Sequence, residues 1–368
     1  MQRMNKYAIL AVFLLLCLPF LLCAVSCTQE SAEAAAAAES EITVLAVGDN
    51  MLYDGTLADA AAAGGGARRY DFRPIYREVS EIIASADFAL FNQESPVTDA
   101  PPASYPCFNA PKSLFTDLEE VGFDAVSIVN NHSLDKGEEG FLETRKNAFT
   151  AGLLPIGGNA LAEQDITYAQ VKGCRIALIG ATYGVNCAGN TERLGYRILT
   201  VGSDAHLAAI ARAKQNADLV ICSVHWGSEG ADAPSASQRA LARKMAEAGA
   251  DLIIGHHPHV LQETEMLDGG TLVAYSLGNF VSEMAYEANA LGAILSVTYE
   301  KSEGGLTIKD YKIIPTVCHF PASFSPNRVI LLEDYTQADA ARHAVKTHYR
   351  HAFSLASLHK RAEGVTHQ

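Results

Sequence analysis

The sequence predicts an α/β fold in which layered β-sheets are flanked by helices. Short apolar runs alternate along the chain with helical stretches of roughly 10 to 15 residues, the spacing expected of strands joined by helices. Continuous apolar runs of this kind are typical of strands that are buried on both faces. Because 49% of the 368 residues are hydrophobic, the chain is able to bury a sizeable core.

The expected elements can be placed in order from these runs. Two of the helices stop at Gly152 and Gly249, since glycine readily adopts the left-handed conformation that ends a helix. Strands are expected at 43–47, 88–91, 125–129, 176–179, 219–224, 252–254, 272–275, 306–315 and 328–332. Helices are expected at 75–84, 114–121, 140–151, 206–216, 237–248 and 335–351.

The N-terminal segment has the layout of an export signal. Arg3 and Lys6 precede an almost wholly apolar run, and small residues follow just before Cys27. We expect a lipoprotein-type signal over residues 1–26, with lipid attached to Cys27. A plain signal peptide and an uncleaved anchor remain the alternatives. A lipid-anchored chain would lie outside the cytoplasm, at the cell membrane.

A low-complexity tether and one folded domain are expected to follow the signal. Residues 27–40 are rich in Ala, Glu and Ser and lack an apolar face, so we interpret them as a tether. The folded domain is expected over 41–368. The formal net charge of −14 argues against a nucleic-acid partner, because phosphate binding needs basic patches.

Polar clusters follow six of the apolar runs, at the points where strands are expected to end. Layered α/β folds carry ligands at the carboxyl ends of their strands, so we expect these clusters to meet in one site. Carboxylates and neutral imidazoles bind zinc, manganese and iron, and two such ions about 3.5–4 Å apart activate water and clamp a phosphate-like group. The clusters contain Asp49; Asn92 and Glu94; Asn130, Asn131, His132 and Asp135; His225, Trp226 and Glu229; His256, His257 and His259; Ser276 and Asn279.

Each cluster alone has a simpler interpretation. A Gly-Asp pair after a strand is usually a turn, and an asparagine pair is often a helix cap. His225 alone fits a core position, and Trp226 is better explained by core packing. The six clusters together favour a metal-binding, hydrolase-type site.

These motifs, in this order, resemble those of a known family. GDNMLYDG, NQESPVT, NNHSLDKGEEG, HWGSE, GHHPHVLQ and YSLGNF are similar to the CapA family of poly-γ-glutamate capsule proteins. That family is related to the calcineurin-like metallophosphatases. The match covers about 43–280, with 281–368 completing the domain. The resemblance implies a metallophosphatase-like layered β-sandwich flanked by helices, with metals at one edge.

The resemblance also implies roles for individual residues. Two divalent ions, of manganese, zinc or iron, are expected, and His132 is expected to protonate the leaving group or stabilise the transition state. His256 is left out of the ligand set because His257-Pro258-His259 is the HxH that matches. The expected ligands are Asp49 and His259 for the first ion, Glu94 as the bridge, and Asn131, His225 and His257 for the second.

One position departs from the wider phosphatases. Their first motif is DxH, whereas Met51 stands two residues after Asp49, so the first ion would lose an imidazole. This departure weakens the expectation that phosphate esters are the substrate.

The leading hypothesis is an extracytoplasmic protein that supports synthesis, export or anchoring of poly-γ-glutamate, beside membrane machinery for making and exporting the polymer. It would retain a metal-dependent hydrolase centre acting on the polymer or on a phosphoester. One alternative is a non-catalytic, metal-containing module that binds or assembles the polymer, and another is a general exported metallophosphoesterase. Because the chain is acidic, contact with an acidic polymer must be local, through metal or basic groups such as Lys112 or Arg73.

Overall fold

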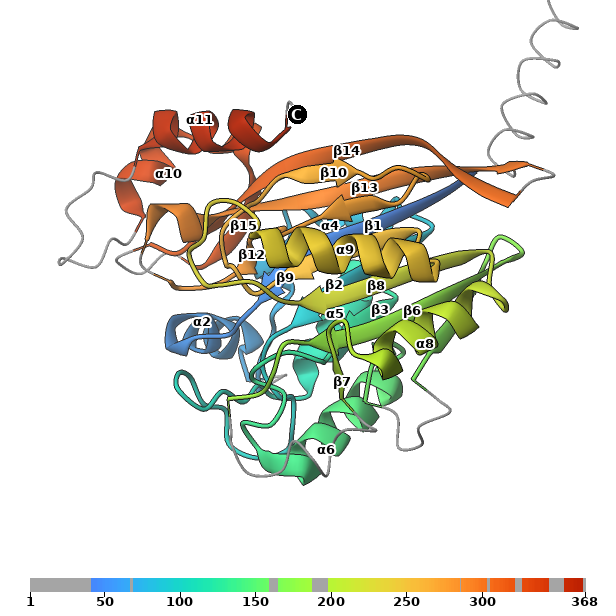
Figure 1. Ribbon diagram of the computed structural model, residues 1–368. Coiled ribbons are helices and arrows are strands. Elements are labelled where there is room, and N and C mark those ends of the chain that lie inside the picture. Colours follow the sequence, from blue (N-terminus) through green and yellow to red (C-terminus); the bar gives the residue numbers. More distant parts are fainter. Residues whose placement is uncertain are drawn as a thin grey trace, which may run out of the picture. The chain divides into compact units, whose positions relative to one another are not determined.

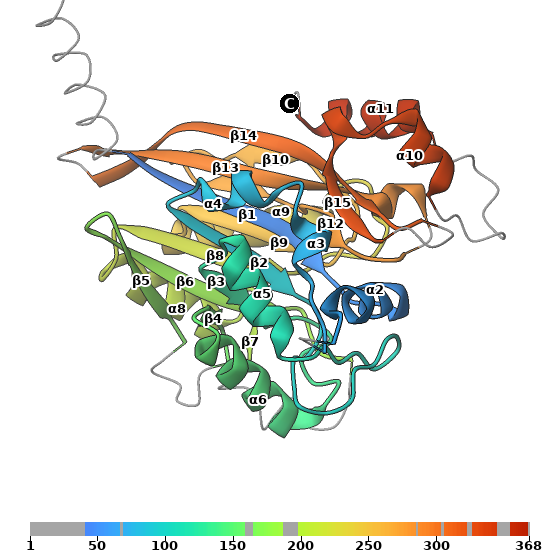
Figure 2. The same ribbon diagram turned by 180° about the vertical axis from the view of Figure 1, so that it is seen from behind.

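Two β-sheets are stacked in this computed structural model, with helices on their outer sides (Figure 1, Figure 2). The structure describes residues 41–66, 69–158, 165–186, 198–284, 286–302, 305–321, 326–343 and 354–366. The chain divides into the units Met1–Ile42 and Thr43–Gln368, and the sheets belong to the second. The expected signal 1–26, the tether 27–40 and Cys27 lie outside the described residues. Within the described ranges, no helix has the length and apolar character needed to cross a membrane.

The first sheet has the strand order β15-β14-β13-β1-β2-β3-β4, and β12 also pairs with β1. Neighbours from β1 to β4 are parallel, whereas β13, β14 and β15 pair antiparallel. Its strands are β1 (Glu41–Asn50), β2 (Phe88–Gln93), β3 (Ala125–Ser127), β4 (Leu154–Ile156), β12 (Asn279–Val281), β13 (Leu291–Ser302), β14 (Gly305–His319) and β15 (Arg328–Leu331).

The second sheet has the order β10-β11-β9-β8-β6-β5, and β7 pairs with β6. Its central strands β6, β8, β9 and β11 are parallel, so their carboxyl ends lie at one edge. Its strands are β5 (Thr167–Val171), β6 (Cys174–Thr182), β7 (Leu199–Thr200), β8 (Leu219–His225), β9 (Leu252–His256), β10 (Thr264–Met266) and β11 (Leu272–Ala274).

Helices cover the outer face of each sheet and bury two separate cores there. The core on the first sheet includes Phe115 and Phe141, and the core on the second includes Ile210 and Met245. The α-helices are α2 (Asp54–Gly64), α3 (Arg73–Tyr76), α4 (Ser80–Ala84), α5 (Ser113–Val121), α6 (Gly137–Thr150), α8 (Asp204–Lys214), α9 (Ala236–Ala248), α10 (Gln337–Arg342) and α11 (Leu355–Thr366). Short 3-10 turns are found at Glu287–Ala290 and Leu332–Asp334.

The side chains of β8 and β9 alternate between the two faces of the second sheet, and His225 and His256 point toward the first sheet. Val220, Cys222 and Val224 pack in the core beneath the helices. Successive side chains of a strand point to opposite faces, so His225 points to the other face, between the sheets. His256 occupies the same face, because it is paired in register with His225 on the neighbouring parallel strand.

An extra residue in β1 turns Asp49 toward the same space. Ala46 is paired with Leu90 and Asp49 with Asn92, so three steps on β1 match two steps on β2. Strict alternation would place Asp49 with Leu45 and Val47, which lie in the helix-covered core. A bulge of one residue exchanges the two faces of the strand that follows it. Asp49 therefore points between the sheets and not beneath the helices.

The expected layered fold is confirmed, and most of the expected elements are present. The expected helix 75–84 is interrupted, because residues 77–79 form a turn between α3 and α4. The expected helix 335–351 is confirmed only over α10, which ends at Arg342; His343 is extended and forms a bridge with Pro321. Residues 344–351 lie outside the described ranges. The strand β13 was not expected, although its apolar, β-branched sequence is typical of a strand.

Candidate metal centre

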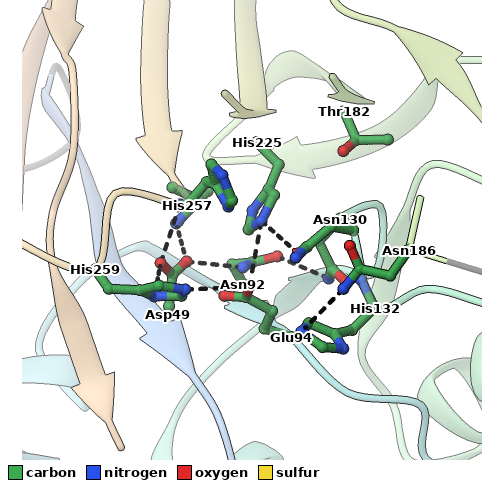
Figure 3. Close-up of polar contacts among 12 residues, drawn as sticks. Asp49, Asn92, Glu94, Asn130, His132, Thr182, Asn186, His225, His257 and His259 are labelled. Atoms are coloured by element: carbon green, nitrogen blue, oxygen red, sulfur yellow. Dashed lines mark hydrogen bonds and ion pairs between the residues drawn. The ribbon is translucent and has the colours of Figure 1, made fainter. Parts of the chain in front are cut away.

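Five of the six polar clusters come together at the carboxyl edge of the two sheets (Figure 3), and the sixth joins them through Asn279, whose Oδ1 lies 3.0 Å from His259 Nδ1. In the first sheet, Asp49 is in register with Asn92 on one side and with Asn279 on the other. In the second sheet, Thr182, His225 and His256 occupy successive register positions. The two rows supply carboxylates and amides from one sheet and imidazoles from the other.

Asp49 is fully buried, and both of its oxygens are engaged. Oδ1 accepts a hydrogen bond from Asn92 Nδ2 at 2.8 Å, and Oδ2 accepts one from the backbone N–H of His257 at 3.1 Å. His259 Nδ1 lies 3.1 Å from Oδ2, and His256 Nδ1 lies 3.1 Å from Oδ1. These contacts hold the carboxylate in one orientation beside two imidazoles.

Glu94 lies at the centre of the cluster and is fully buried, with no hydrogen bond to either carboxylate oxygen. Its Oε1 lies 3.3 Å from His225 Nε2 and 3.5 Å from His259 Nε2. Among the described residues, Glu94 belongs to both groups of side chains that have the spacing of metal ligands, one with His257 and His259 and the other with Asp49 and His225. Glu94 is therefore the residue that the two groups share.

The spacing between these atoms matches that of ligands around a common ion. Two atoms that each lie about 2.1 Å from one ion, at an angle of about 90–110°, are about 3.0–3.4 Å apart. The distance of 3.3 Å between Glu94 Oε1 and His225 Nε2 falls in this range, and the distance of 3.5 Å between Glu94 Oε1 and His259 Nε2 lies just above it. Asn131 Oδ1 lies 2.8 Å from His225 Nε2, which places the amide oxygen beside the same imidazole nitrogen. The donor set and its burial are compatible with divalent metal binding.

The loop after β9 is strained in a way that directs its histidines into the site. His257 has φ 95° and His259 has φ 55°, a left-handed conformation that is uncommon for any residue other than glycine. Such conformations cost of order 1–3 kcal/mol each and cluster at functional sites. The Pro258 carbonyl accepts a hydrogen bond from Gly230 N–H at 2.8 Å, which ties this loop to the one after β8.

Electrostatics in the cluster favour added positive charge. Burial raises the pKa of Glu94 to about 8, an effect that Asp49 strengthens and His259 opposes. Burial acts to lower the pKa of His259, but the carboxylates of Glu94 and Asp49 raise it to about 10. Burial lowers the pKa of His257 to about 3, and neighbouring histidines add to this effect. His257 therefore stays neutral, as a metal ligand must be, whereas Glu94 and His259 would each release a proton on binding a metal.

His132 lies beside the metal-ligating groups and is not a member of either of them. Its Nδ1 is 2.8 Å from Asp135 Oδ2, and that same oxygen accepts a hydrogen bond from Phe108 N–H at 2.8 Å. The Phe108 ring meets the imidazole edge-to-face, with centroids 4.8 Å apart. Burial acts to lower the pKa of His132, but the contact with Asp135 and the charge of Glu94 raise it above its usual value. This environment fixes the ring and favours a protonated imidazole.

Two of the predicted cluster residues, Asn92 and Asn130, form hydrogen bonds that position neighbouring site residues. Asn130 Nδ2 donates to Asn92 Oδ1 at 3.3 Å and to the Gln93 carbonyl at 2.8 Å. Asn130 Oδ1 accepts from His132 N–H at 3.0 Å, and Asn92 in turn donates to Asp49. The two amides thus link the Asp49 end of the site to the His132 end.

The other cluster residues have mixed roles. Asn279 Oδ1 lies 3.0 Å from His259 Nδ1 and positions that ring. Ser276 accepts from Gly278 N–H at 3.2 Å and so stabilises a turn. Trp226 is buried and donates to the Tyr275 carbonyl, which agrees with its interpretation as a core residue. Glu229 acts through its charge, which adds to burial in raising the pKa of Tyr183.

Two residues near the site were missed in the sequence, and both follow β6. Tyr183 packs on the imidazole of His257, with centroids 4.6 Å apart, and is 48% exposed. Asn186 Nδ2 lies 3.4 Å from His132 Nε2, and its backbone N–H donates to the Asn131 carbonyl at 2.7 Å. Their position after an apolar strand was the available signal, but that strand end carries no acid or histidine.

Stacked sheets with a buried carboxylate and imidazole cluster at their shared edge define a layered α/β protein with a candidate divalent-metal centre. Residues 43–284 match the family model described as bacterial capsule synthesis protein PGA_cap. The chain belongs to this family.

Named relatives agree with this assignment. The capsule biosynthesis protein CapA of Bacillus anthracis is 34% identical over 256 residues, which cover 66% of this chain and 61% of that protein. The PGA biosynthesis protein CapA of Bacillus subtilis (strain 168) is 33% identical over 242 residues, covering 63% and 62%. The chain thus matches about six tenths of the length of these curated relatives. A solved structure, the calcineurin-like phosphoesterase YfkN from Bacillus subtilis, is similar with a TM-score of 0.41 and 16% identity, covering 75% of this chain and 90% of that chain.

Proposed function

We propose that this chain supports the synthesis, export or anchoring of an acidic polymer of the poly-γ-glutamate type, outside the cytoplasm, through a divalent-metal hydrolase centre. Membership in a capsule synthesis family supports the polymer role. The names of the two Bacillus relatives, which refer to capsule and PGA biosynthesis, point the same way.

Glu94 is the observation that carries the metal centre. A buried carboxylate without hydrogen bonds costs several kcal/mol unless it is paired or binds a metal. Both oxygens of Glu94 lack hydrogen bonds, and imidazoles, a second carboxylate and an amide oxygen surround it. One or two divalent cations would satisfy all of these groups at once.

The residues of the site have distinct roles in the proposed reaction. Cations held by Asp49, Glu94, Asn131, His225, His257 and His259 would lower the pKa of a bound water and polarise an amide carbonyl or a phosphoryl group. His132 donates a proton to the leaving group, and Asp135 orients its ring through Nδ1. Asn186 approaches the other ring nitrogen, Nε2, which is the one that faces away from Asp135.

The two basic side chains named from the sequence form ion pairs within the chain. Lys112 Nζ lies 2.9 Å from Asp99, and Arg73 forms ion pairs with Asp71 and Glu120. The proposed cations would supply positive charge at the site for attracting carboxylates of a polyanion.

Hydrolysis by the purified full-length chain tests this function. We expect the protein to hold stoichiometric manganese, zinc or iron and to cleave poly-γ-glutamate or the phosphodiester bis(p-nitrophenyl) phosphate. Treatment with a chelator should abolish cleavage, and adding the metal back should restore it. Absence of stoichiometric transition metal in the wild type would overturn the metal centre and the function together.

A non-catalytic polymer-binding module is the second candidate. It is favoured by Met51, which removes an imidazole from the first site, and by a relative from Mycobacterium tuberculosis named a probable polyglutamine synthesis accessory protein, 26% identical over 219 residues. Bound metal without any turnover in the assay above would select this candidate over the hydrolase.

Lipid anchoring at Cys27 is the localisation that we propose. The apolar run and the small residues before Cys27 support it. Metabolic labelling with a radioactive fatty acid should mark the wild-type protein and leave the Cys27→Ala variant unlabelled. Equal labelling of the two proteins would show that Cys27 is not the lipidated residue.

A further inference from the structure

The first metal position has one imidazole fewer than the DxH arrangement supplies. Met51 occupies the position two residues after Asp49, is 2% exposed, and its backbone N–H is bonded to the Val281 carbonyl at 2.8 Å. A thioether is a soft ligand, whereas manganese, zinc and iron prefer carboxylates and imidazoles in sites of this kind. Asp49 therefore needs a nitrogen ligand from elsewhere in the chain if the first site is to be filled.

His256 places an imidazole nitrogen at that carboxylate. It is the last residue of β9, is 2% exposed, and shares the inner face of the sheet with His225. Its Nδ1 lies 3.1 Å from Asp49 Oδ1, yet it makes no hydrogen bond. A buried imidazole nitrogen that lies beside a carboxylate and has no hydrogen-bond partner is suited to receive a cation.

The distance also fits shared coordination. Ligand atoms around one ion are about 3.0–3.4 Å apart, and the contact between His256 and Asp49 lies in this range. His259 makes a contact of the same length with the other oxygen of Asp49. The two histidines thus flank the carboxylate, one at each oxygen.

A role in orienting Asp49 does not account for His256. The Oδ1 atom already accepts a hydrogen bond from Asn92, and the Oδ2 atom accepts one from the His257 backbone. Both oxygens stay fixed without any contribution from His256.

We propose that His256 Nδ1 is a ligand of the first metal and supplies the imidazole that Met51 lacks. This inference rests on the metal centre of the proposed function. It makes the GHHPH segment a source of three metal-binding imidazoles, at His256, His257 and His259.

Metal titration of the full-length protein tests the proposal. After chelation, wild-type protein and the His256→Ala variant are titrated with manganese, and bound metal is counted by mass spectrometry. The wild type should bind two equivalents, and His256→Ala should lose one of them or bind it at least about 100-fold more weakly. The double variant Met51→His/His256→Ala should recover the lost equivalent, because it restores an imidazole in the DxH position.

Two further measurements separate the possible failures. His206→Ala, which removes a buried histidine of α8 whose Nδ1 accepts a hydrogen bond from Gly202 N–H, should keep both equivalents. If His256→Ala does not fold, zinc X-ray absorption of the wild type decides the question: four imidazoles per two ions support the proposal, and three contradict it. Two equivalents of unchanged affinity in folded His256→Ala would overturn this inference alone, whereas a wild type that binds no metal would overturn the proposed function as well.

Discussion

The Glu94→Gln variant should lose most of its bound metal, while its metal-free form becomes more stable than the metal-free wild type. Glutamine keeps the shape of the side chain but removes the negative charge that we place next to both ions. We expect metal affinity to fall at least about 100-fold, because loss of a bridging ligand exceeds the 10- to 100-fold cost of losing a supporting partner. In the metal-free protein, the variant removes a buried, unpaired carboxylate, which should stabilise the fold by about 1–3 kcal/mol.

The two effects have opposite signs, so they are measured separately. Elemental analysis gives the metal content, and calorimetry after chelation gives the unfolding temperature. Glu263→Gln is a matched control, because it removes a carboxylate that pairs with Arg239 away from the site; it should leave the metal content unchanged. Wild-type metal content in Glu94→Gln would show that Glu94 is not a ligand.

The His132→Ala variant should retain the wild-type metal content but turn over substrate about 10²- to 10⁴-fold more slowly. The Nδ1 atom of His132 contacts Asp135, an arrangement that suits a proton donor. The turnover number is expected to fall more than KM rises, because proton transfer contributes in the transition state and adds little to substrate binding. Steady-state kinetics together with elemental analysis measure both quantities.

Two neighbouring variants sharpen this result. Asp135→Asn should slow turnover without removing metal, since the ring keeps a polar partner but loses the carboxylate. His257→Ala should lose metal and turnover together. If His132→Ala hydrolyses substrate at the wild-type rate, His132 is not the proton donor. If hydrolysis is lost but polymer production stays intact, the catalytic interpretation fails and the polymer-binding module remains.

The sequence by itself determined the layered α/β class, most of the strands and the six strand-end clusters that the structure brings together. These features are local: an apolar run predicts a strand, and the residues that follow it lie at the strand's carboxyl end. The ordered motifs added the family, which the match over residues 43–284 shows. Asn186 and Tyr183 were not predicted as site residues, because their contacts are with His132 and His257, which are distant in the sequence.

The tertiary structure decided which side chains face one another. A one-residue bulge in β1 turns Asp49 away from the helix-covered core, and its register depends on pairing with β2, which is distant in the sequence. The register of β8 and β9 places His256 beside His225. The stacking of the sheets then brings His256 into contact with Asp49. The motif alone excluded His256 as a ligand, because ligand geometry depends on distances between strands that a single chain segment does not specify.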